Sequence, residues 1–222
     1  MSRQATLPFV PTLTQIPSDP AVEPLLRRAL LRREPVIVGA AGADPYSVES
    51  GQAGQAAFVR SLLQALTRVE GLEVAITTRS PRILQDLSLL VELDQRHMVR
   101  VDVPLPAVDP ELALRIEPRE PEPEARLWAV SQLAAEGITT RVVVKPVLPG
   151  VNDGEAELKA LFEAAAQAGA GDIALETAPA ARSQLSLWPG ARKSGPGREV
   201  LLTTFRRLRL EHGFPRSQPG RG

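Results

Sequence analysis

The sequence predicts an α/β fold built on a parallel sheet, and two observations support this prediction. Short apolar segments typical of buried strands alternate with longer segments whose apolar residues recur at helical spacing. No two strand segments are joined by a hairpin signal, so right-handed crossovers between parallel strands are expected. Two architectures satisfy this pattern, an open doubly wound sheet and part of a (β/α) barrel.

Five segments have the length and the apolar content of strands that are buried in a parallel sheet. The first is PVIVGA, which runs into the loop GAAGADPYSVES. The predicted strands are residues 36–40, 72–78, 97–105, 139–148 and 172–177.

Six segments have the apolar spacing of helices, and their ends carry capping signals. Asp19 is the expected N-cap of the first, with Pro20 at the first helical position. Gly137 and Gly213 follow two others and are expected to terminate them. The predicted helices are residues 19–34, 55–69, 81–93, 125–137, 155–170 and 199–213.

Length and charge set the first limits on function. The 222 residues are sufficient for one sizeable core, and 26 Lys and Arg balance 26 Asp and Glu. No bulk charge therefore favours a nucleic-acid or membrane partner. The chain has no apolar run of membrane-spanning length, and its first residues lack the apolar block of a signal peptide, so we expect a cytoplasmic protein.

The chain contains no cysteine and only two histidines. It therefore supplies no disulfide, no thiolate ligand for a metal or iron–sulfur cluster, and no cysteine nucleophile. His97 and His212 lie far apart in the sequence, so a histidine-rich metal centre is not expected. Acid–base chemistry is left to carboxylates, lysines and the single Tyr46.

Composition changes along the chain suggest how it is organised. We expect a Pro-rich arm over residues 1–19, a single α/β domain over 20–213 and a disordered tail over 214–222. Within the domain, residues 177–198 are rich in Gly, Pro and basic residues and are expected to form a mobile loop.

Part of that loop is a candidate for contact with nucleic acid. It holds Arg192, Lys193 and Arg198 together with Trp188, which offers charge and a stacking surface. The patch is short and the chain is neutral overall, so a plain surface loop is the preferred interpretation.

In either architecture, ligands approach the carboxyl ends of the strands, where the loops after the strands meet. The loop after the first strand, GAAGADP, is not GxGxxG and has no Lys-Ser or Lys-Thr pair behind it. A phosphate-binding loop is therefore not indicated. Taken alone, Asp44-Pro45 favours a turn before a helix.

Six short motifs in sequence order resemble the radical SAM superfamily, in the branch of spore photoproduct lyase and related DNA-repair-photolyase-like proteins. The match covers roughly residues 20–175. It implies a TIM-barrel-like partial (β/α) barrel of about five parallel βα units, with the first βα unit missing. The motifs are ADPYSVE at 43–49, TTRS at 77–80, QDLSLL at 85–90, DPELALRIEP at 109–118, RLWAVSQLAAEGI at 126–138 and KPVLPGVND at 145–153.

The resemblance implies a cofactor, S-adenosylmethionine, but this chain departs from the family in the group that activates it. Such enzymes carry a CxxxCxxC loop whose thiolates hold a [4Fe–4S] cluster, and no iron–sulfur cluster is expected from a chain without cysteine. S-adenosylmethionine remains a candidate ligand. By resemblance, its binding residues are Asp44, Glu49, Arg79 and Ser80.

Several positions have lost the polar group of the family pattern. Ala43 replaces a threonine, Gln85 an arginine, and Pro104 and Ala107 a serine and a threonine. Arg79 replaces a lysine and keeps only its charge. We therefore expect a cluster-less, catalytically degenerate protein.

Each surviving polar residue also has a structural interpretation. Asp44 either faces a ligand or forms a turn. Arg79 either binds an anion or, as we expect, pairs with Asp86. Arg126 is a candidate catalytic residue, although a solvated arginine is the commoner case. Lys145, late in an apolar strand, is the other candidate, and it is either desolvated and functional or extends past the rim.

Three further positions lie close to these candidates. Glu117, before Pro118, either contacts a ligand or ends a helix. Asn152 and Asp153 are expected to cap the helix that follows them, and Trp128 is expected to pack in the core.

Three functions remain open. The first is a silent radical-SAM-like domain that binds a ligand or a partner. The second is part of an active enzyme whose cluster loop lies outside this sequence. The third is a cluster-free α/β-barrel enzyme that acts through Lys145, Asp44 or Arg79, which would then converge in one cleft.

The absence of a first βα unit predicts an exposed sheet edge. We expect residues 5–34 to cover that edge, or a protein partner or a second copy of the chain to do so.

Overall fold

The computed structural model describes residues 22–39, 44–47, 53–176 and 198–214. Five strands form one sheet, and every neighbouring pair is parallel. The prediction of a parallel α/β fold with about five βα units is confirmed. The strands are β1 (Val36–Val38), β2 (Glu73–Thr77), β3 (Met98–Pro104), β4 (Thr139–Val144) and β5 (Asp172–Leu175).

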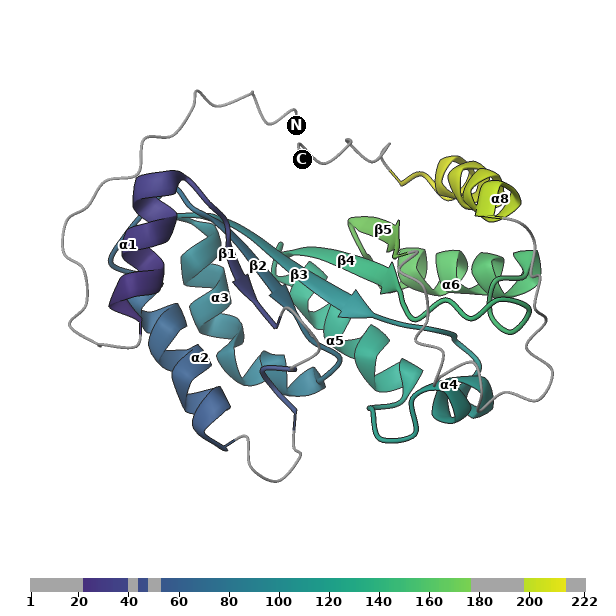
Figure 1. The fold of residues 1–222 in the computed structure, drawn as a ribbon, viewed down its shortest axis with the longest axis horizontal. Coiled ribbons are helices and arrows are strands. Elements are labelled where there is room, and N and C mark those ends of the chain that lie inside the picture. Colours follow the sequence, from purple (N-terminus) through teal and green to yellow (C-terminus); the bar gives the residue numbers. More distant parts are fainter. Residues whose placement is uncertain (1–21, 40–43, 48–52, 177–197, 215–222) are drawn as a thin grey trace.

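The strand order distinguishes between the two predicted architectures. Consecutive strands are neighbours throughout, in the order β1-β2-β3-β4-β5 (Figure 1). A doubly wound sheet reverses its order at a switch point, and the described strands contain no such reversal. Their order is that of successive units in a (β/α) barrel, although β1 and β5 remain the two outer strands of the described sheet.

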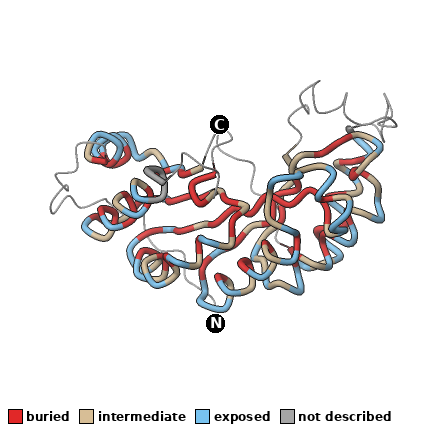
Figure 2. Tube along the Cα trace, turned by 90° about the horizontal axis from the view of Figure 1, so that it is seen from below, coloured by how far each residue is buried: buried red, intermediate tan, exposed pale blue. Residues whose placement is uncertain are grey.

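Most of the helices connect successive strands, and they follow an arc along one side of the sheet, with their exposed turns outward and the buried segments inside (Figure 2). Among the described residues, none of these helices has the length and apolar content needed to cross a membrane. They are α1 (Glu23–Arg32), α2 (Ala53–Leu66), the short 3₁₀ helix η2 (Pro81–Asp86), α3 (Leu87–Asp94), α4 (Pro110–Ile116), α5 (Pro123–Ala135), α6 (Glu155–Gln167) and α8 (Arg198–Glu211).

The two faces of the sheet differ because side chains alternate along each strand. The side chains on the helix-covered face are mainly apolar, and they form the core with the helices. The opposite face, called the inner face below, carries Glu73, Arg100, Asp102, Arg141 and Lys145. The core strand residues are Val36, Val38, Val74, Ile76, Val99, Val101, Val103, Val142, Val144 and Ile173.

Most predicted elements lie within a few residues of their observed ends. Gly137 and Gly213 follow α5 and α8 with φ of 82° and 74°, a conformation that glycine adopts readily. The proposed cap Asp19 lies outside the described residues, and α1 begins at Glu23 with Val22 as its N-cap. The arm, the mobile loop and the tail also fall almost entirely outside the described ranges.

Two features of the helices differ from the prediction. The helix α4 was not among the predicted helices; its N-cap Asp109 accepts a hydrogen bond from the N–H of Leu112 at 2.8 Å, and Glu117 ends it, as one of the two alternatives for that residue expected. Seven residues are too few for a clear helical period, so the capping residue was the available signal. Trp128 is 53% exposed and does not pack in the core, because α5 turns Ala129 and Leu133 inward instead.

Candidate functional site

The loops at the carboxyl ends of the first strands are joined by a group of polar residues. We call this group the strand-end cluster and define it as Asp44, Thr78, Arg79, Glu117 and Arg126. All but Arg79 have largely buried side chains. The cluster links the β1 and β2 loops to the segment between α4 and α5.

Asp44 connects the loop after β1 to the end of β2 through hydrogen bonds. Its Oδ1 accepts hydrogen bonds from the N–H of Tyr46 at 2.9 Å and from Oγ1 of Thr78 at 2.7 Å. Its Oδ2 accepts from the N–H of Arg79 at 2.6 Å. A carboxylate with these three donors is well satisfied within the chain.

The close approach of these two loops depends on Gly39. Its φ is 83°, and a Cβ at this position would lie 2.2 Å from the carbonyl oxygen of Thr77. Only glycine fits such a position without moving the backbone. The small residue at the end of β1 therefore brings Asp44 to β2.

Glu117 bridges two arginines in the second half of the cluster. Its Oε1 lies 2.9 Å from Nε of Arg79, and its Oε2 lies 2.7 Å from Nη1 of Arg126. Arg126 also donates to the carbonyl oxygens of Pro104 at 2.9 Å and Pro121 at 2.7 Å. Its side chain is 1% exposed, so the expectation of a solvated arginine was wrong.

The expected pair between Arg79 and Asp86 is absent, because Asp86 has other partners. The Tyr46 hydroxyl donates to Asp86 at 3.2 Å, and Nε of Arg60 donates to it at 2.8 Å. Burial, with the nearby Asp86 carboxylate, raises the pKa of Tyr46 well above its ordinary range. A buried phenol held in its neutral form is a structural group and a poor proton donor to substrate.

Two of the predicted cofactor residues remain, Ser80 and Glu49. Ser80 is buried, and its Oγ accepts from the N–H of Arg82 at 3.3 Å at the start of η2. Its N–H donates to Oγ1 of Thr78 at 3.0 Å, which connects it to the cluster. Glu49 lies outside the described residues.

Lys145 lies apart from the strand-end cluster, just after β4. Its Nζ is 2.8 Å from Oε1 of Glu176, which follows β5, and the two side chains are 39% and 43% exposed. Within the described part of the chain, no hydrogen bond or ion pair joins Lys145 to Asp44 or Arg79. The three residues therefore do not form one hydrogen-bonded constellation.

A second set of polar side chains on the inner face was missed from the sequence. Asp102 accepts a bidentate interaction from Arg141, at 2.8 Å to Nε and 2.6 Å to Nη2. Nε of Arg100 also donates to Asp102 at 3.0 Å, and its Nη1 lies 3.3 Å from Glu73. With Lys145 and Glu176 we call this set the inner-face pairs.

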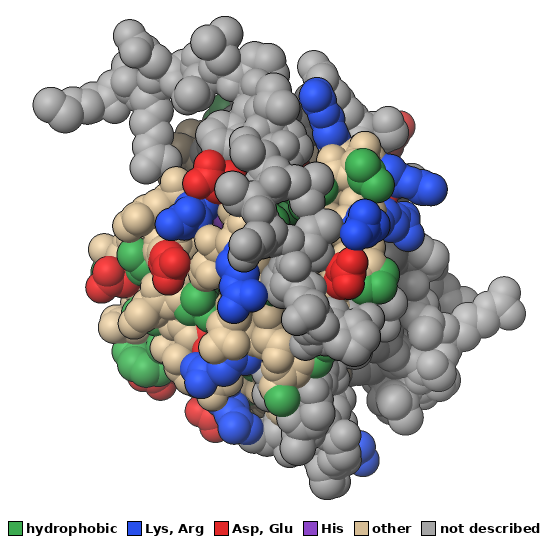
Figure 3. Space-filling model, turned by 90° about the vertical axis from the view of Figure 1, so that its left-hand side faces the viewer, with side chains coloured by type: hydrophobic (Ala, Val, Ile, Leu, Met, Phe, Trp, Pro, Cys, Tyr) green, Lys and Arg blue, Asp and Glu red, His purple; other side chains and the backbone are tan. Residues whose placement is uncertain are grey.

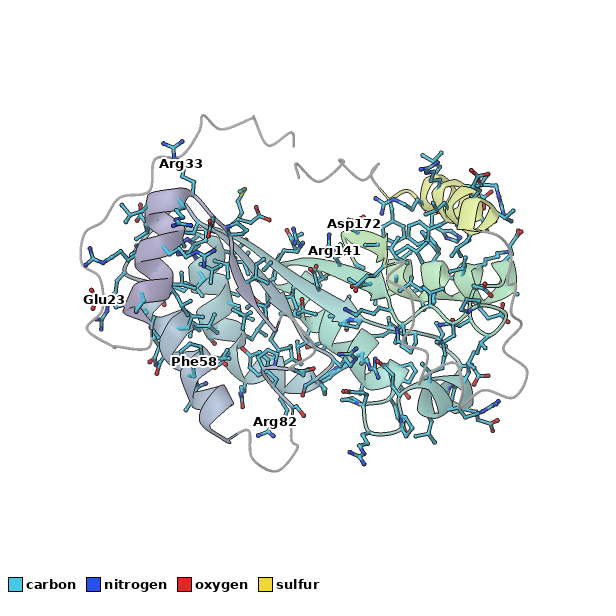
Figure 4. The ribbon with its side chains drawn as sticks, viewed as in Figure 1. Glu23, Arg33, Phe58, Arg82, Arg141 and Asp172 are labelled. Carbon is cyan, nitrogen blue, oxygen red and sulfur yellow. The ribbon has the colours of Figure 1, made fainter. Side chains whose placement is uncertain are left out.

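The position of these pairs follows from strand periodicity. Arg141 and Asp172 are register partners on β4 and β5, and they project from the side of the sheet opposite to Phe58 of α2 (Figure 4). The signal was present in MVRVDVP, where charged residues alternate with apolar ones, and in TTRVVV, where Arg141 precedes the apolar run.

The expected capping role of Asn152 and Asp153 was also wrong. Gly154 is the N-cap of α6. The amide of Asn152 instead accepts from the N–H of Leu148 at 2.7 Å and donates to the carbonyls of Pro106 and Pro146, both at 2.8 Å. These bonds fix the loop after β4, which lies beside the loop after β3.

A small cavity of about 150 Å³ adjoins the strand-end cluster. Glu117, Glu120 and Arg126 are among its lining residues. Burial raises the pKa of the Glu120 carboxyl above its ordinary value. Among the described residues, no group of three or more His, Asp or Glu side chains is placed to hold a metal ion.

His97 belongs to the opposite end of the sheet and is not part of either site. Its Nδ1 accepts from the N–H of Leu72 at 3.2 Å, and its Nε2 lies 3.0 Å from the carbonyl oxygen of Leu66. The carbonyl requires a donor, so the neutral ring with a proton on Nε2 satisfies both partners. Burial lowers the pKa of His97 below its ordinary value, and we assign it a structural role.

Comparison with known proteins gives relatives but no family. No family model matches the chain. It is 36% identical over 145 residues to uncharacterized proteins of Mycobacterium tuberculosis and Mycobacterium bovis, a match that covers 65% of this chain and 41% of each relative. It is also 33% identical over 79 residues to an uncharacterized protein of Acidianus two-tailed virus, covering 36% of this chain and 26% of that protein. This chain is thus homologous to uncharacterized mycobacterial proteins, and its match spans less than half of their length.

Proposed function

We propose that this chain is a radical-SAM-like domain that performs no radical chemistry by itself and binds a small zwitterionic ligand on the inner face of its sheet. S-adenosylmethionine, which carries an ammonium and a carboxylate on its methionine moiety, is the first candidate. The motif order described above supports the ancestry, and the absence of cysteine supports the loss of radical chemistry.

One observation carries this proposal, the contrast between saturated and accessible polar groups. Asp44, Arg79 and Arg126, the residues first expected to bind a ligand, are bonded within the chain. In the inner-face pairs the cations are more accessible, with Arg141 27% and Lys145 39% exposed, and Glu176 is 43% exposed, whereas Asp102 is 8% exposed. The accessible cations support binding at the inner-face pairs over binding at the strand-end cluster.

The charges of the inner-face pairs suit a zwitterion. Arg141 and Lys145 offer donors to a carboxylate, and Asp102 and Glu176 offer acceptors to an ammonium group. Each cation already has an anion beside it, so a ligand with a single charge would leave one member of a pair without its partner. A zwitterion supplies a carboxylate to the cation and an ammonium group to the anion.

Isothermal titration calorimetry with S-adenosylmethionine tests this proposal. We expect saturable binding to the purified chain and at least a tenfold loss of affinity in Arg141→Ala and in Lys145→Ala, about 1.4 kcal/mol. Lys159→Ala is the matched control, because Lys159 forms an exposed pair with Glu163 on α6 and faces no ligand. Equal affinities in all four proteins, or no heat at millimolar ligand, would reject the proposal.

A second candidate function is favoured by the length of the relatives. Since the match covers 41% of the mycobacterial proteins, this domain occurs there within a longer chain. Part of an active radical SAM enzyme, with its cluster loop supplied by other sequence, is consistent with that length. A CxxxCxxC loop encoded next to this sequence, and S-adenosylmethionine cleavage after anaerobic reconstitution of the joined chain, would support it over the first proposal.

A further inference from the structure

The two outer strands of the described sheet differ in how far their free edges are covered. Beside β5 lies α8, packed on α6 through Phe162 and Phe205 with ring centroids 5.0 Å apart. Arg209 of α8 donates to the carbonyl oxygen of Ile173 in β5, and its Nη2 lies 2.8 Å from Asp172. A side chain thus satisfies part of the backbone edge of β5 and places a buried cation there.

The edge of β1 has no equivalent protection among the described residues. β1 pairs with β2 on one side, and no described strand lies on the other. The unpaired N–H and C=O groups of such an edge strand are a template for another strand. Ile37, in the middle of β1, is 58% exposed.

A groove of about 500 Å³ follows this edge, between α1, β1 and α2. Leu25, Val36, Ile37 and Phe58 are among its apolar lining residues, and Leu25 is 47% exposed. Figure 3 faces this end of the molecule and shows hydrophobic side chains between basic and acidic ones. Exposed apolar side chains beside an unpaired strand edge are typical of an interaction surface.

The charges at the groove favour an identical partner. Among the described residues that line the groove, the charged ones are Arg28 and Glu34, which form a 2.7 Å ion pair with each other, and Glu34 also lies 3.9 Å from Arg32. The lining of the groove therefore carries both signs of charge. Two copies that meet across a two-fold axis would bring Arg28 and Glu34 of each copy near the opposite charges of the other, without net repulsion.

We propose that β1 is a homodimer interface, in which the β1 strands of two copies pair edge to edge. Two-fold symmetry places the same patch on both sides and makes the paired strands antiparallel. The two sheets then form one continuous sheet across the axis, and Leu25 and Ile37 of both copies are removed from water. This inference does not depend on the ligand proposed above.

Sedimentation velocity of the full chain over a wide concentration range tests the proposal. We expect a species of twice the 23.9 kDa chain mass that dissociates on dilution. Ile37→Lys places a charge at the centre of the interface and should give a monomer. Met98→Lys is the matched control, because Met98 is a 69% exposed apolar residue of β3, away from either edge, and this variant should remain dimeric.

A covalent test uses the absence of cysteine from the chain. Ile37→Cys introduces the only thiol, and the two-fold axis places it near its copy, so mild oxidation should give a disulfide-linked dimer. A disulfide requires Cα atoms about 4.4–6.8 Å apart, so Met98→Cys should remain unlinked.

A chain that stays monomeric at all concentrations overturns the proposal, and amide exchange then identifies the reason. Slow exchange of residues 36–38 in that monomer would assign the groove to another segment of the same chain. Fast exchange would show an edge that is simply exposed. A dimer that Ile37→Lys leaves intact would place the interface elsewhere.

Discussion

The strand-end cluster and the inner-face pairs are both charged, but they differ in how completely the chain satisfies them. Among the described residues, Arg126 is 1% exposed with three oxygen partners, whereas Lys145 is 39% exposed with one. Buried ionic groups are costly unless every partner is in place, so we expect the cluster to act as a structural brace between its loops. In the inner-face pairs the cations and Glu176 are partly exposed to solvent, although Asp102 is buried, so we expect these pairs to contribute less to stability than the cluster.

The largest expected effect is that of Arg126→Leu on stability. The change leaves the carbonyl oxygens of Pro104 and Pro121 without this donor and Glu117 with only Arg79. Breaking a buried pair in this way costs about 3–5 kcal/mol of the free energy of unfolding. Urea denaturation measures it, with the exposed Arg27→Ala as control, and a loss below about 1 kcal/mol would show that the cluster is not a brace.

Asp44→Asn should come next. The amide nitrogen cannot accept a hydrogen bond, so one side of the former carboxylate loses its donors from Thr78 or from the N–H of Arg79. We expect a loss of about 1–3 kcal/mol in the same urea experiment. Glu163→Gln on the exposed face of α6 is the matched control. A variant as stable as the parent would leave Asp44 available for a ligand role.

The pH dependence of stability is expected to reflect His97, a buried polar residue at the end of the strands opposite to the strand-end cluster. Its pKa is lowered in the fold, so the unfolded chain binds the proton more readily. The free energy of unfolding should therefore fall as the pH drops below about 6.5, by at most about 1.4 kcal/mol per pH unit. Urea unfolding between pH 7 and pH 5 checks this, and His97→Gln should be less stable at pH 7 but should lose this part of the pH dependence.

Arg141→Ala should have the smallest effect on stability. Its side chain is 27% exposed, and loss of its pair with Asp102 is expected to cost about 1 kcal/mol or less, since Arg100 remains beside the carboxylate. A loss comparable to that of Arg126→Leu would remove the distinction between the two groups. The same variant is expected to show the clearest loss of ligand affinity. The variant with the smallest loss of stability is therefore expected to have the largest loss of binding.

The fold was predictable because its signals are local. Strands such as residues 98–104 are apolar runs bounded by polar turns, and helices such as α6 have a clear 3.6-residue period. Their parallel order followed from the alternation alone. The helix α4 was not predicted because about two turns give little periodic signal.

The site was predictable only in part. Sequence order brought Asp44, Arg79 and Arg126 to the same ends of the strands, as the structure shows. It did not indicate that Glu117, 38 residues beyond Arg79, would fill the space between the two arginines. Pairing across distant segments depends on helix orientation, and no local pattern encodes it.

The contact of Arg209 with β5 has a consequence for how far the molecule can assemble. If two molecules join through β1, the outer strand of the described sheet at each end of the pair is β5, where Arg209 occupies part of the edge, so we expect growth to stop there. If both borders were open, each added molecule would present a fresh one, and fibres would result. We therefore expect that replacing this single arginine, more than any change at β1, would turn a finite particle into a polymerising one.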